Sequence, residues 1–365
     1  MTPPHLTRLL RARLRPYRRP VAIIIVLQLA QTLANLYLPS LNADIIDDGV
    51  LTGDTGYILS AGGQMLAITL AQIACAAGAV FLSARTAMAV GRDVRGAVFR
   101  QVQSFSVREV GQFGAPSLLT RSTNDVQQVQ MLVLLVFTLL VSAPFMCVGS
   151  IVLALGEDVP LSALLLVMVP VLAVVLVRVS RALGPVFRSM QGRIDRVNRV
   201  LREQISGARV VRAFVRDRHE QERFDAANAD LKDTAVRVGR IVAWMFPLVT
   251  LIMNVTGVGI LWFGGHRIDS GGMQVGAVTA FLNYVMQIFM SVMMSTFVFF
   301  QVPRAEVCAE RIDEILATEP SVAPPLAPVA RLRRSGLLEL RGVEFRFPGA
   351  EEPVLRDIDM TARPG

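Results

Sequence analysis

Amide and thioether side chains stand within long apolar stretches of this 365-residue sequence. Amides hydrogen-bond to polar groups, and methionine is flexible and polarizable, so it suits surfaces that accept varied apolar ligands. Several of these residues recur at spacings of three and four, which places them on one face of a helix. Our candidates for a cavity that receives lipophilic or amphipathic molecules are Gln28, Gln31, Asn35, Asn254, Asn283, Gln287, Met290 and Met294. The alternative for any one of the amides is hydrogen bonding between packed helices.

Metal binding and catalysis have little support in the sequence. The three cysteines, Cys75, Cys147 and Cys308, form no C-x-x-C pair, and the three histidines are scattered. This spacing favours no disulfide framework, zinc site or catalytic triad. The only lysine is Lys232, so the chain lacks a G-x-x-x-x-G-K-[ST] loop, in which backbone amides and a lysine hold nucleotide phosphates. We therefore predict no metal site and no catalytic residue in this chain.

The elements that position the candidate residues are predicted to be membrane-spanning helices. Hydrophobic residues make up 53% of the sequence, and the mean hydropathy is +0.49. A span needs about 20 mostly apolar residues, and the stretches that qualify are 20–42, 57–83, 129–155, 159–180, 241–264 and 275–302. The first follows a basic arm, but it runs too long for a signal peptide and lacks a cleavage site of small residues, so we predict a retained span. The predicted fold class is an all-α membrane domain with six spans.

The distribution of basic residues predicts the orientation, because Lys and Arg collect in cytoplasmic loops. All 37 except Arg267 fall in residues 1–19, 83–128, 178–240 and 303–365. We predict a multi-pass protein of the inner (plasma) membrane with both termini in the cytoplasm and residues 1–19 as a basic N-terminal arm. This topology accounts for the net charge of +8. No module that combines aromatic and basic residues indicates nucleic-acid binding.

The two inner loops are long, about 45 and 60 residues, whereas the outer loops have roughly a dozen residues or fewer. From Val197 to Phe224 apolar residues recur at three and four with arginines between them, which is typical of amphipathic helices. A helical extension of 25 residues reaches roughly 35 to 40 Å beyond the membrane. We therefore predict long helical extensions that contact a partner in the cytoplasm.

Each inner segment is predicted to break near its middle. Gly111, Gly114 and Pro116 interrupt the helical pattern of the first, and Gly207 interrupts the second. The residues predicted to cap the returning helix of the first segment are Ser122, Thr123 or Asn124. Such a break places a short transverse element at the tip of each extension, although isolated loop caps would give a similar pattern.

These inner segments resemble the coupling regions of ATP-binding cassette (ABC) exporters. The stretch "FGAPSLLTRSTNDVQQV" is similar to the first region, with Thr120 in place of the usual Ser, and "GARVVRAFVRDRHEQERF" is similar to the second. The likeness covers all six spans in the expected order. It implies docking on nucleotide-binding domains through Gly114–Thr123 and Gly207–Arg216. The residues that it assigns to coupling are Phe113, Gly114, Leu118, Arg121, Thr123, Asn124, Asp125, Gly207, Arg209, Arg212 and Phe214.

The C-terminal part differs in character from the spans. Residues 317–336 are Pro-rich and predict a linker, and residues 337–365 have strand-like spacing with a shift near Gly342. They resemble the first strands of an ABC nucleotide-binding domain, in which Phe347 would stack on adenine. We expect a truncated chain, or a remainder on a separate polypeptide, since no phosphate-binding loop follows. Without further strands to join, 338–365 are expected to be poorly ordered.

The resemblance implies a half-transporter with its transmembrane domain at residues 20–316. Its partners would be a second half-transporter in a homodimer or heterodimer, nucleotide-binding domains, the lipid bilayer and a lipophilic small molecule. ATP and Mg²⁺ would bind to the complete transporter, and neither would bind to this chain alone, which should not hydrolyse ATP. The alternative is a non-catalytic membrane protein, such as a receptor, an assembly partner or an inactive remnant. A channel is disfavoured, because no Arg-rich span or filter sequence is present.

Overall fold

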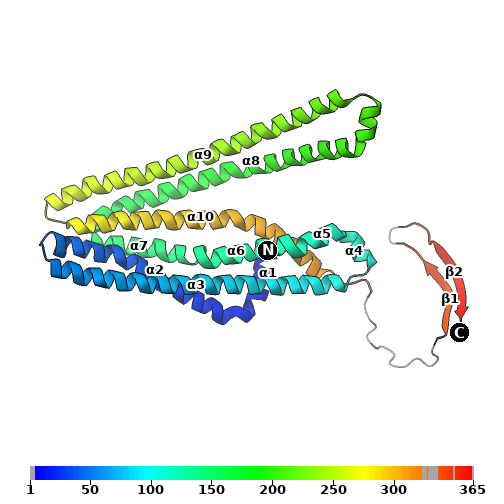
Figure 1. Cartoon of the computed structure of the whole chain (residues 1–365), viewed down its shortest axis with the longest axis horizontal. Coiled ribbons are helices and arrows are strands. Elements are labelled where there is room, and N and C mark those ends of the chain that lie inside the picture. Colours follow the sequence, from blue (N-terminus) through cyan, green and yellow to red (C-terminus); the bar gives the residue numbers. More distant parts are fainter. Residues whose placement is uncertain (1–4, 323–326, 328–335, 348–349, 364–365) are drawn as a thin grey trace. The chain divides into compact units, whose positions relative to one another are not determined.

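A computed structural model of the chain describes residues 5–322, 327, 336–347 and 350–363 (Figure 1). Its helices are α1 (His5–Leu14), α2 (Arg18–Asp44), α3 (Thr55–Gln103), α4 (Val107–Phe113), α5 (Ala115–Thr120), α6 (Val126–Leu135), α7 (Ser142–Glu157), α8 (Val159–Ala213), α9 (Asp217–Asp269) and α10 (Val275–Ala317). A 3₁₀ turn, η1 (Arg15–Tyr17), and three π turns, η2 (Ile45–Val50), η3 (Arg121–Asp125) and η4 (Val136–Leu140), join several of them. The strands are β1 (Leu338–Phe345) and β2 (Leu355–Ala362).

Six helical stretches are long and apolar enough to cross a membrane. They are His5–Val50, Thr55–Gln103, Ala115–Glu157, Val159–Ala213, Asp217–Asp269 and Val275–Ala317. Each contains one predicted span, so the six-span prediction is confirmed. The 55 residues of α8 make a helix about 80 Å long, whereas the hydrocarbon core is about 30 Å thick. Helices α3, α8 and α9 therefore extend far beyond a bilayer.

The chain divides into two compact units. The larger contains the residues up to Gln103 and Gly114–Thr318, and the smaller contains Ser104–Phe113 and the described residues from Glu319 onward. Within the larger unit, α10 contacts α1, α2, α6, α7 and α9. Helices α8 and α9 lie side by side along their lengths and diverge from the other long helices toward their own junction (Figure 1). Helix α10 is thus the central element, and α8–α9 form a separate pair.

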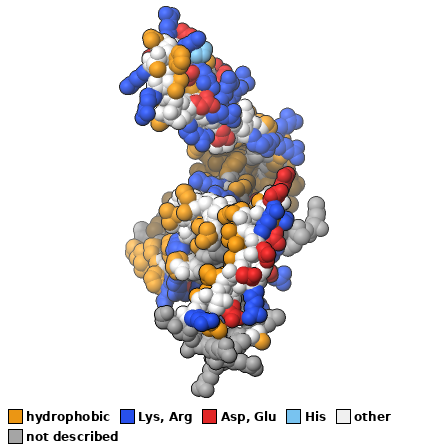
Figure 2. Space-filling model, turned by 90° about the vertical axis from the view of Figure 1, so that its right-hand side faces the viewer, with side chains coloured by type: hydrophobic (Ala, Val, Ile, Leu, Met, Phe, Trp, Pro, Cys, Tyr) orange, Lys and Arg blue, Asp and Glu red, His pale blue; other side chains and the backbone are white. Residues whose placement is uncertain are grey.

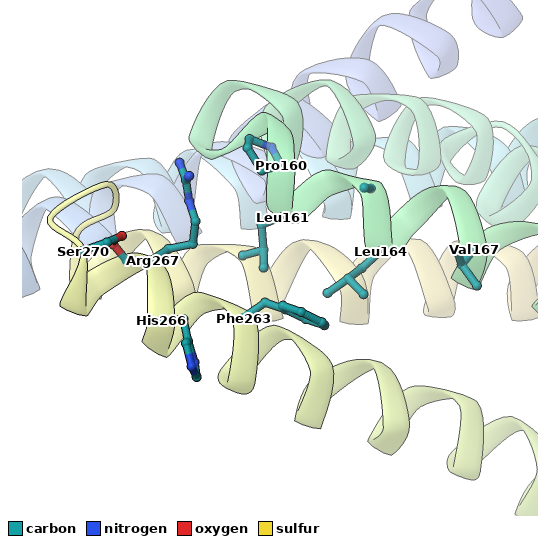
Figure 3. Close-up of a pocket in the computed structure, with 9 residues that line it drawn as sticks. Pro160, Leu161, Leu164, Val167, Phe263, His266, Arg267 and Ser270 are labelled. Atoms are coloured by element: carbon teal, nitrogen blue, oxygen red, sulfur yellow. The ribbon is translucent and has the colours of Figure 1, made fainter.

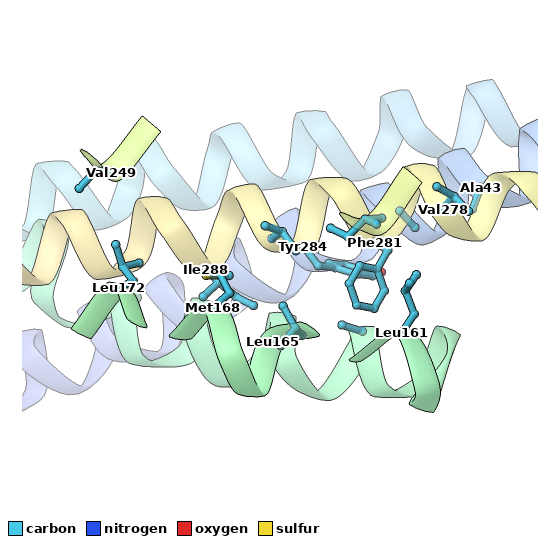
Figure 4. Packing of buried hydrophobic residues seen from close by; sticks show 14 of the residues in the cluster. Ala43, Leu161, Leu165, Met168, Leu172, Val249, Val278, Phe281, Tyr284 and Ile288 are labelled. Carbon is cyan, nitrogen blue, oxygen red and sulfur yellow. The ribbon is translucent and has the colours of Figure 1, made fainter. Parts of the chain in front are cut away.

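The main apolar cluster forms where α8 and α10 face each other (Figure 4). Helix α10 contributes Phe281 and Ile288, both fully buried, and α8 contributes Leu165, Met168 and Leu172. The residues on each helix are spaced by three, four or seven, so they form one continuous stripe. Close packing of these stripes holds the start of the α8–α9 pair to the rest of the larger unit.

The N-terminal helix packs on α10, so this part of the predicted arm is held in place. Leu6 and Leu9 are buried, and the Leu6 backbone N–H donates to Glu306 over 3.3 Å. His5 Nδ1 lies 2.8 Å from Asp313 Oδ2, and Arg8 forms an ion pair with the same carboxylate. We call these contacts between α1 and α10 the clasp.

The predicted break at Gly114 is confirmed, but the predicted caps are wrong. Gly114 separates α4 from α5 with a φ of +76°, a value that glycine adopts without strain. Helix α5 then continues through η3 into α6, so Ser122, Thr123 and Asn124 lie inside a helical stretch. The hydroxyls of Ser122 and Thr123 donate to the Leu119 carbonyl over 2.9 and 2.8 Å. The returning helix already begins after Gly114, with Pro116 in its first turn, where proline is favoured.

The predicted break at Gly207 is also wrong. Helix α8 passes through Gly207 and ends at Ala213, and the chain reverses over residues 214–216. A single glycine in a helix interior costs only about 1 kcal/mol relative to alanine. Backbone hydrogen bonding continues past the glycine to the end of the helix, where the Phe214 N–H donates to the Val210 carbonyl over 3.0 Å, so Gly207 does not end it.

Both predicted strands are present, and they are antiparallel neighbours. Leu340 pairs with Met360 and Val343 with Ile358, and the register shifts between these two pairs. Gly342 lies at the shift with a φ of +57°, and its N–H donates to Asp359 Oδ1 over 2.7 Å. The shift near Gly342 is therefore confirmed. An isolated pair of strands is marginal in water, and poor order of this segment stays a prediction. Most of the predicted linker, and residues 348–349 and 364–365, lie outside the described residues.

Replacing Phe281 with alanine tests the α8–α10 cluster. We expect a loss of about 3 to 5 kcal/mol in the free energy of unfolding, because a fully buried ring leaves a cavity. The measurement is denaturant unfolding in one fixed detergent. Met286 is 48% exposed on the same helix, so Met286→Ala is the matched control and should change stability much less. Equal losses in the two variants would contradict a stabilising role for the cluster.

Candidate functional site

The reversal between α8 and α9 is built as a helix C-terminal motif with an unusual residue. The Arg216 N–H donates to the Val211 carbonyl over 3.0 Å, and the Val215 N–H donates to the Arg212 carbonyl over 3.2 Å. This is the Schellman pattern, whose left-handed position is usually glycine. Here Val215 occupies it with a φ of +51°, which is a genuine outlier for a β-branched side chain. Strain of this kind persists where the surrounding structure imposes it, and it is common at functional sites.

The same reversal exposes its apolar side chains. Phe214 is 74% exposed and Val215 is 83% exposed. Arg209 and Arg212 are also exposed and lie within the last two turns of α8, whereas Gly207 is partly buried and lies further along the helix. Figure 2 shows this tip at the top of the view, where basic side chains surround apolar ones. We call residues 209–216 the α8–α9 tip.

Contacts between α8 and α9 fix the α8–α9 tip in one arrangement. Arg223 of α9 reaches Glu203 of α8 with a separation of 2.5 Å, and Gln204 donates to the Glu220 carbonyl over 2.9 Å. A polar side chain of each helix thus binds the other helix a few turns from the reversal. The exposed Phe214 and Val215 are therefore presented on a rigid element.

Helix α4, in the smaller unit, begins with a capping box that the sequence analysis missed. Glu109 Oε2 accepts from the Ser106 backbone N–H over 2.8 Å, and Ser106 Oγ accepts from the Arg108 N–H over 3.2 Å. The pattern S-x-x-E at residues 106–109 is the sequence signal for this motif. Glu109 also accepts from the Ser321 N–H over 3.3 Å. Hydrogen bonds from Ser321 and Ser106 lower the pKa of the Glu109 carboxyl from 4.5 to about 2.

Phe113 lies at the other end of α4 and stacks on Phe105. Their ring centroids are 5.8 Å apart and the planes differ by 6°. Of the predicted coupling residues, Phe113 alone belongs to the smaller unit. Its ring is therefore engaged within that unit.

In the larger unit, two predicted coupling residues bind α10 and do not face outward. Arg121 donates to the Arg311 carbonyl over 3.0 Å and to Glu314 over 2.5 Å. Asp125 is 4% exposed and forms an ion pair with Arg311 over 3.3 Å. These contacts hold η3 against α10. Asp125 is buried but Arg311 is 37% exposed, so this ion pair is only partly buried. Together the contacts of Arg121 and Asp125 join the helical stretch of the third span to that of the sixth.

The other candidates in this segment differ in exposure. Leu118 is buried, whereas Thr123 and Asn124 are exposed. Leu119, which the sequence analysis did not select, is 66% exposed. The outward surface of α5–η3 therefore includes Leu119, Thr123 and Asn124, together with Ala115 and Pro116 at the start of α5.

Two cavity candidates act as hydrogen-bonding links between helices. Gln28 is 2% exposed and donates to the Phe137 carbonyl over 3.1 Å. Phe137 lies in η4, and π turns leave backbone groups that need other partners. Gln287 of α10 donates to the Asn35 carbonyl of α2 over 3.4 Å and accepts from Ser150 of α7 over 3.3 Å. These contacts favour the alternative for Gln28 and Gln287, namely hydrogen bonding between packed helices.

The remaining candidates do not converge on a single pocket of this chain. Asn254 lines a pocket of about 380 Å³ between α9 and α10, together with Met286. The seven other candidates are not among the lining residues of that pocket. Of the eight cavity candidates, all except Gln28 are partly or fully exposed: Gln31, Asn35, Asn254, Asn283, Gln287, Met290 and Met294. Asn283 and Met290 lie on exposed positions of α10.

A larger apolar pocket, of about 570 Å³, lies between the start of α8 and the end of α9 (Figure 3). Leu161 and Leu164 of α8 and Phe263 of α9 point into it. Near the start of α8, Arg267 binds Asp158 over 2.6 Å, and Asp158 caps the helix by accepting from the Leu161 N–H. None of the predicted cavity residues lines this pocket. It depends on the angle between two helices, which the sequence does not encode locally.

Phe347 is the residue of this chain that is predicted to contact a nucleotide. Phe347 is 56% exposed, and its ring meets Phe345 edge to face with centroids 5.0 Å apart. An exposed aromatic face fits adenine stacking. The sequence supplies no lysine near it to hold phosphates. Within the part of the chain that the structure describes, no cluster of three or more His, Cys, Asp or Glu residues could hold a metal ion.

Comparison with known proteins places these features in a family. Residues 21–292 match the family described as the ABC transporter transmembrane region. An uncharacterized ABC transporter ATP-binding protein of Mycobacterium tuberculosis is 50% identical over 98% of this chain and 62% of its own length. A Bacillus subtilis protein of the same description is 35% identical over 96% of this chain and 61% of its own length.

A more distant relative carries a more specific name. An ATP-dependent lipid A-core flippase of Syntrophus aciditrophicus is 25% identical over 94% of this chain and 56% of its own length. This chain spans about three fifths of the length of the M. tuberculosis and B. subtilis relatives.

Acid is expected to loosen the start of α4. Because the pKa of Glu109 falls from 4.5 to about 2 in the folded chain, its stabilisation is fully present above about pH 4.5 and is lost as the pH falls toward 2. Hydrogen exchange of the α4 amides, corrected for intrinsic rates, should show weaker protection at pH 3 than at pH 6. Glu109→Gln cannot titrate and should show no such change. The same loss of protection in that variant would contradict this role of the carboxylate.

Proposed function

This chain belongs to the family of ABC transporter transmembrane regions, and we propose that it is the translocating half of an ATP-driven exporter of lipophilic or amphipathic compounds. The observation that carries the proposal is the α8–α9 tip. It combines a strained, rigid reversal with exposed Phe214 and Val215 at the end of helices far longer than a bilayer is thick. Such a surface suits docking by a partner outside the membrane.

We infer that the α8–α9 tip docks on a nucleotide-binding domain. Aromatic residues, including phenylalanine, and arginine are enriched at protein interfaces, and Phe214 lies between Arg212 and Arg216. The outward surface of α5–η3, with Leu119 at its centre, would form a second docking element. Its ion pairs with α10 would pass movement of that element to the sixth span. Continuous helices such as α8 and α9 would transmit closure of the nucleotide-binding domains by rigid-body motion.

The cargo would be apolar or amphipathic. The predicted spans are nearly free of ionisable side chains, which disfavours an ion path or a proton relay. The exposed Asn283 and Met290 of α10, and the Asn254 pocket, offer amide and thioether groups to such a molecule. The name of the lipid A-core flippase relative supports a lipidic cargo. Gln28 and Gln287 would then be structural links beside the cargo path.

The complete transporter would contain a second half-transporter, identical or related. Exposed apolar residues in the extramembrane part of α8, such as Ile205 at 77% exposure, give that partner a surface to cover. Nucleotide-binding domains would bind ATP and Mg²⁺. The boundaries of α10 at Ala317 and β1 at Leu338 support a transmembrane domain at 20–316, a linker at 317–336 and the start of an ATP-binding domain at 337–365.

Truncating Phe214 should separate ATP hydrolysis from transport in the complete transporter. The loss of a central aromatic anchor costs about 2 kcal/mol in typical interfaces, so transport per ATP hydrolysed should fall about tenfold or more in Phe214→Ala. The measurements are substrate uptake into inside-out vesicles and ATPase activity on the same preparation. Arg121 is unsuited to this test, because its substitution would also release α10.

Val236→Ala is the control for this experiment. Val236 is 43% exposed and lies on α9, well away from the α8–α9 tip. It should leave the ratio of transport to hydrolysis unchanged. Unchanged transport in Phe214→Ala, or equal losses in both variants, would contradict docking by the tip. Absence of any ATP-dependent transport in the unaltered protein would instead favour the non-catalytic alternative.

The orientation has a direct test. The arginine distribution supports an inner-membrane protein with both termini and the α8–α9 tip in the cytoplasm. In a background without Cys75, Cys147 and Cys308, Val215→Cys should react with a membrane-impermeant maleimide in inside-out vesicles only. Thr52→Cys, in the turn after η2, should react in right-side-out vesicles only. The opposite pattern would overturn the proposed orientation and with it the docking of the tip.

A further inference from the structure

A basic pocket lies where α1 and η1 meet α3. It has a volume of about 410 Å³, and its lining residues are Ala12, Arg13, Pro16, Arg92, Asp93, Gly96 and Arg100. The first three belong to α1 and η1, and the other four lie on one side of α3. Three guanidinium groups thus share one pocket with a single carboxylate. The pocket therefore carries a net positive charge.

Asp93, the carboxylate in this pocket, already has hydrogen-bonding partners within the chain. Tyr17 donates to Asp93 Oδ2 over 2.6 Å, and Arg92 forms an ion pair with Asp93 Oδ1 over 2.9 Å. Among the described residues, no hydrogen bond or ion pair joins Arg13 or Arg100 to an acceptor. Two arginines therefore remain available for an anion. Guanidinium groups bind phosphate oxygens in pairs of parallel hydrogen bonds.

The pocket is held open by contacts on both sides. The clasp fixes α1 on α10 through His5, Arg8 and Leu6. Tyr17 ties η1 to α3 through Asp93. Gly96 lies in the wall of the pocket beside the guanidinium of Arg100. The arrangement does not depend on a bound molecule to bring its walls together.

The position along the helices places the pocket at the edge of the hydrocarbon core. The apolar span of α2 begins at residue 20, directly after Arg18 and Arg19. Ile24 of α2 and Ala87 of α3 lie in one buried cluster, so residue 20 lies beside α3 a few residues beyond Ala87. Arg13 and Arg92 then lie near the level of lipid headgroups. The Arg100 side chain reaches back along α3 toward this level, because its Nη1 would lie 3.5 Å from a Cβ at Gly96. Tyrosine, the residue at position 17, is also enriched at this level.

We propose that this pocket binds the phosphate of an anionic phospholipid, with Arg13 and Arg100 holding the phosphate oxygens and the acyl chains beside the apolar spans. On the orientation proposed above, the lipid belongs to the cytoplasmic leaflet. Basic pockets between helices on that side of a membrane are suited to anionic headgroups. A free phosphate has the same chemistry, but the level of the pocket favours a lipid.

The test uses the purified chain in a neutral detergent and follows its thermal unfolding midpoint. Phosphatidylglycerol, phosphatidylcholine and inorganic phosphate are each added at the same concentration. A ligand that binds only the folded state raises the midpoint, and we expect a rise of about 3 °C or more with phosphatidylglycerol. Phosphatidylcholine and inorganic phosphate should give much smaller shifts. An equal shift with either of them would overturn the assignment of an anionic lipid.

Two double variants distinguish lipid binding in the pocket from a general effect of positive charge. Arg13→Gln with Arg100→Gln removes the proposed ligands and should abolish the shift caused by phosphatidylglycerol. Arg11→Gln with Arg95→Gln removes the same charge from the same two helices at positions that do not line the pocket, and it should keep the shift. Equal effects of the two variants would overturn the proposal. If the pocket variant does not fold, the single variant Arg100→Gln, at an exposed position, must lose at least half of the shift for the proposal to stand.

Discussion

A bilayer offers a chain hydrogen-bond partners only within its own backbone, and its hydrocarbon core is only about 30 Å thick. These two limits require helices in the spans, but they do not require helices of 49 to 55 residues such as α3, α8 and α9. The surplus length remains helical outside the membrane because α8 and α9 pack on each other, joined by Arg223–Glu203 and related contacts. Continuous backbone hydrogen bonding then connects each span to its distant end.

Sequence periodicity predicts much of this architecture, but it does not predict all the places where the chain reverses direction. Six apolar runs and helical spacing from Val197 to Phe224 predict the spans and extensions, because burial and backbone pairing are regular along a helix. Gly114 and Gly342 mark true departures, because both adopt a positive φ. Gly207 does not, and the reversal occurs at Val215 instead. The usual signal for a left-handed position is glycine, so contacts between helices, and not local preference, set this turn.

In the candidate site, too, the sequence identifies motifs but not the helices that their side chains contact. The motif around Arg121 and Asp125 is recognisable in the sequence, but only the structure places both side chains on α10, where they form a junction between spans. Gln28 was selected as a polar residue in an apolar run, and the structure gives it the carbonyl of a π turn as partner. Spacing identifies a helix face but not the helix that it meets. The basic pocket and the pocket in Figure 3 were missed for this reason.

The clasp joins residues far apart in the sequence, since His5 and Asp313 are separated by 308 positions. A ribosome adds roughly 5 to 20 residues per second, so Asp313 is made some tens of seconds after His5 has left the exit tunnel. During that interval the apolar side chains of Leu6 and Leu9 lack their final neighbours. The surface of the membrane can cover these side chains in the meantime, and the amino-terminal helix reaches its final position only after the end of α10 has been made.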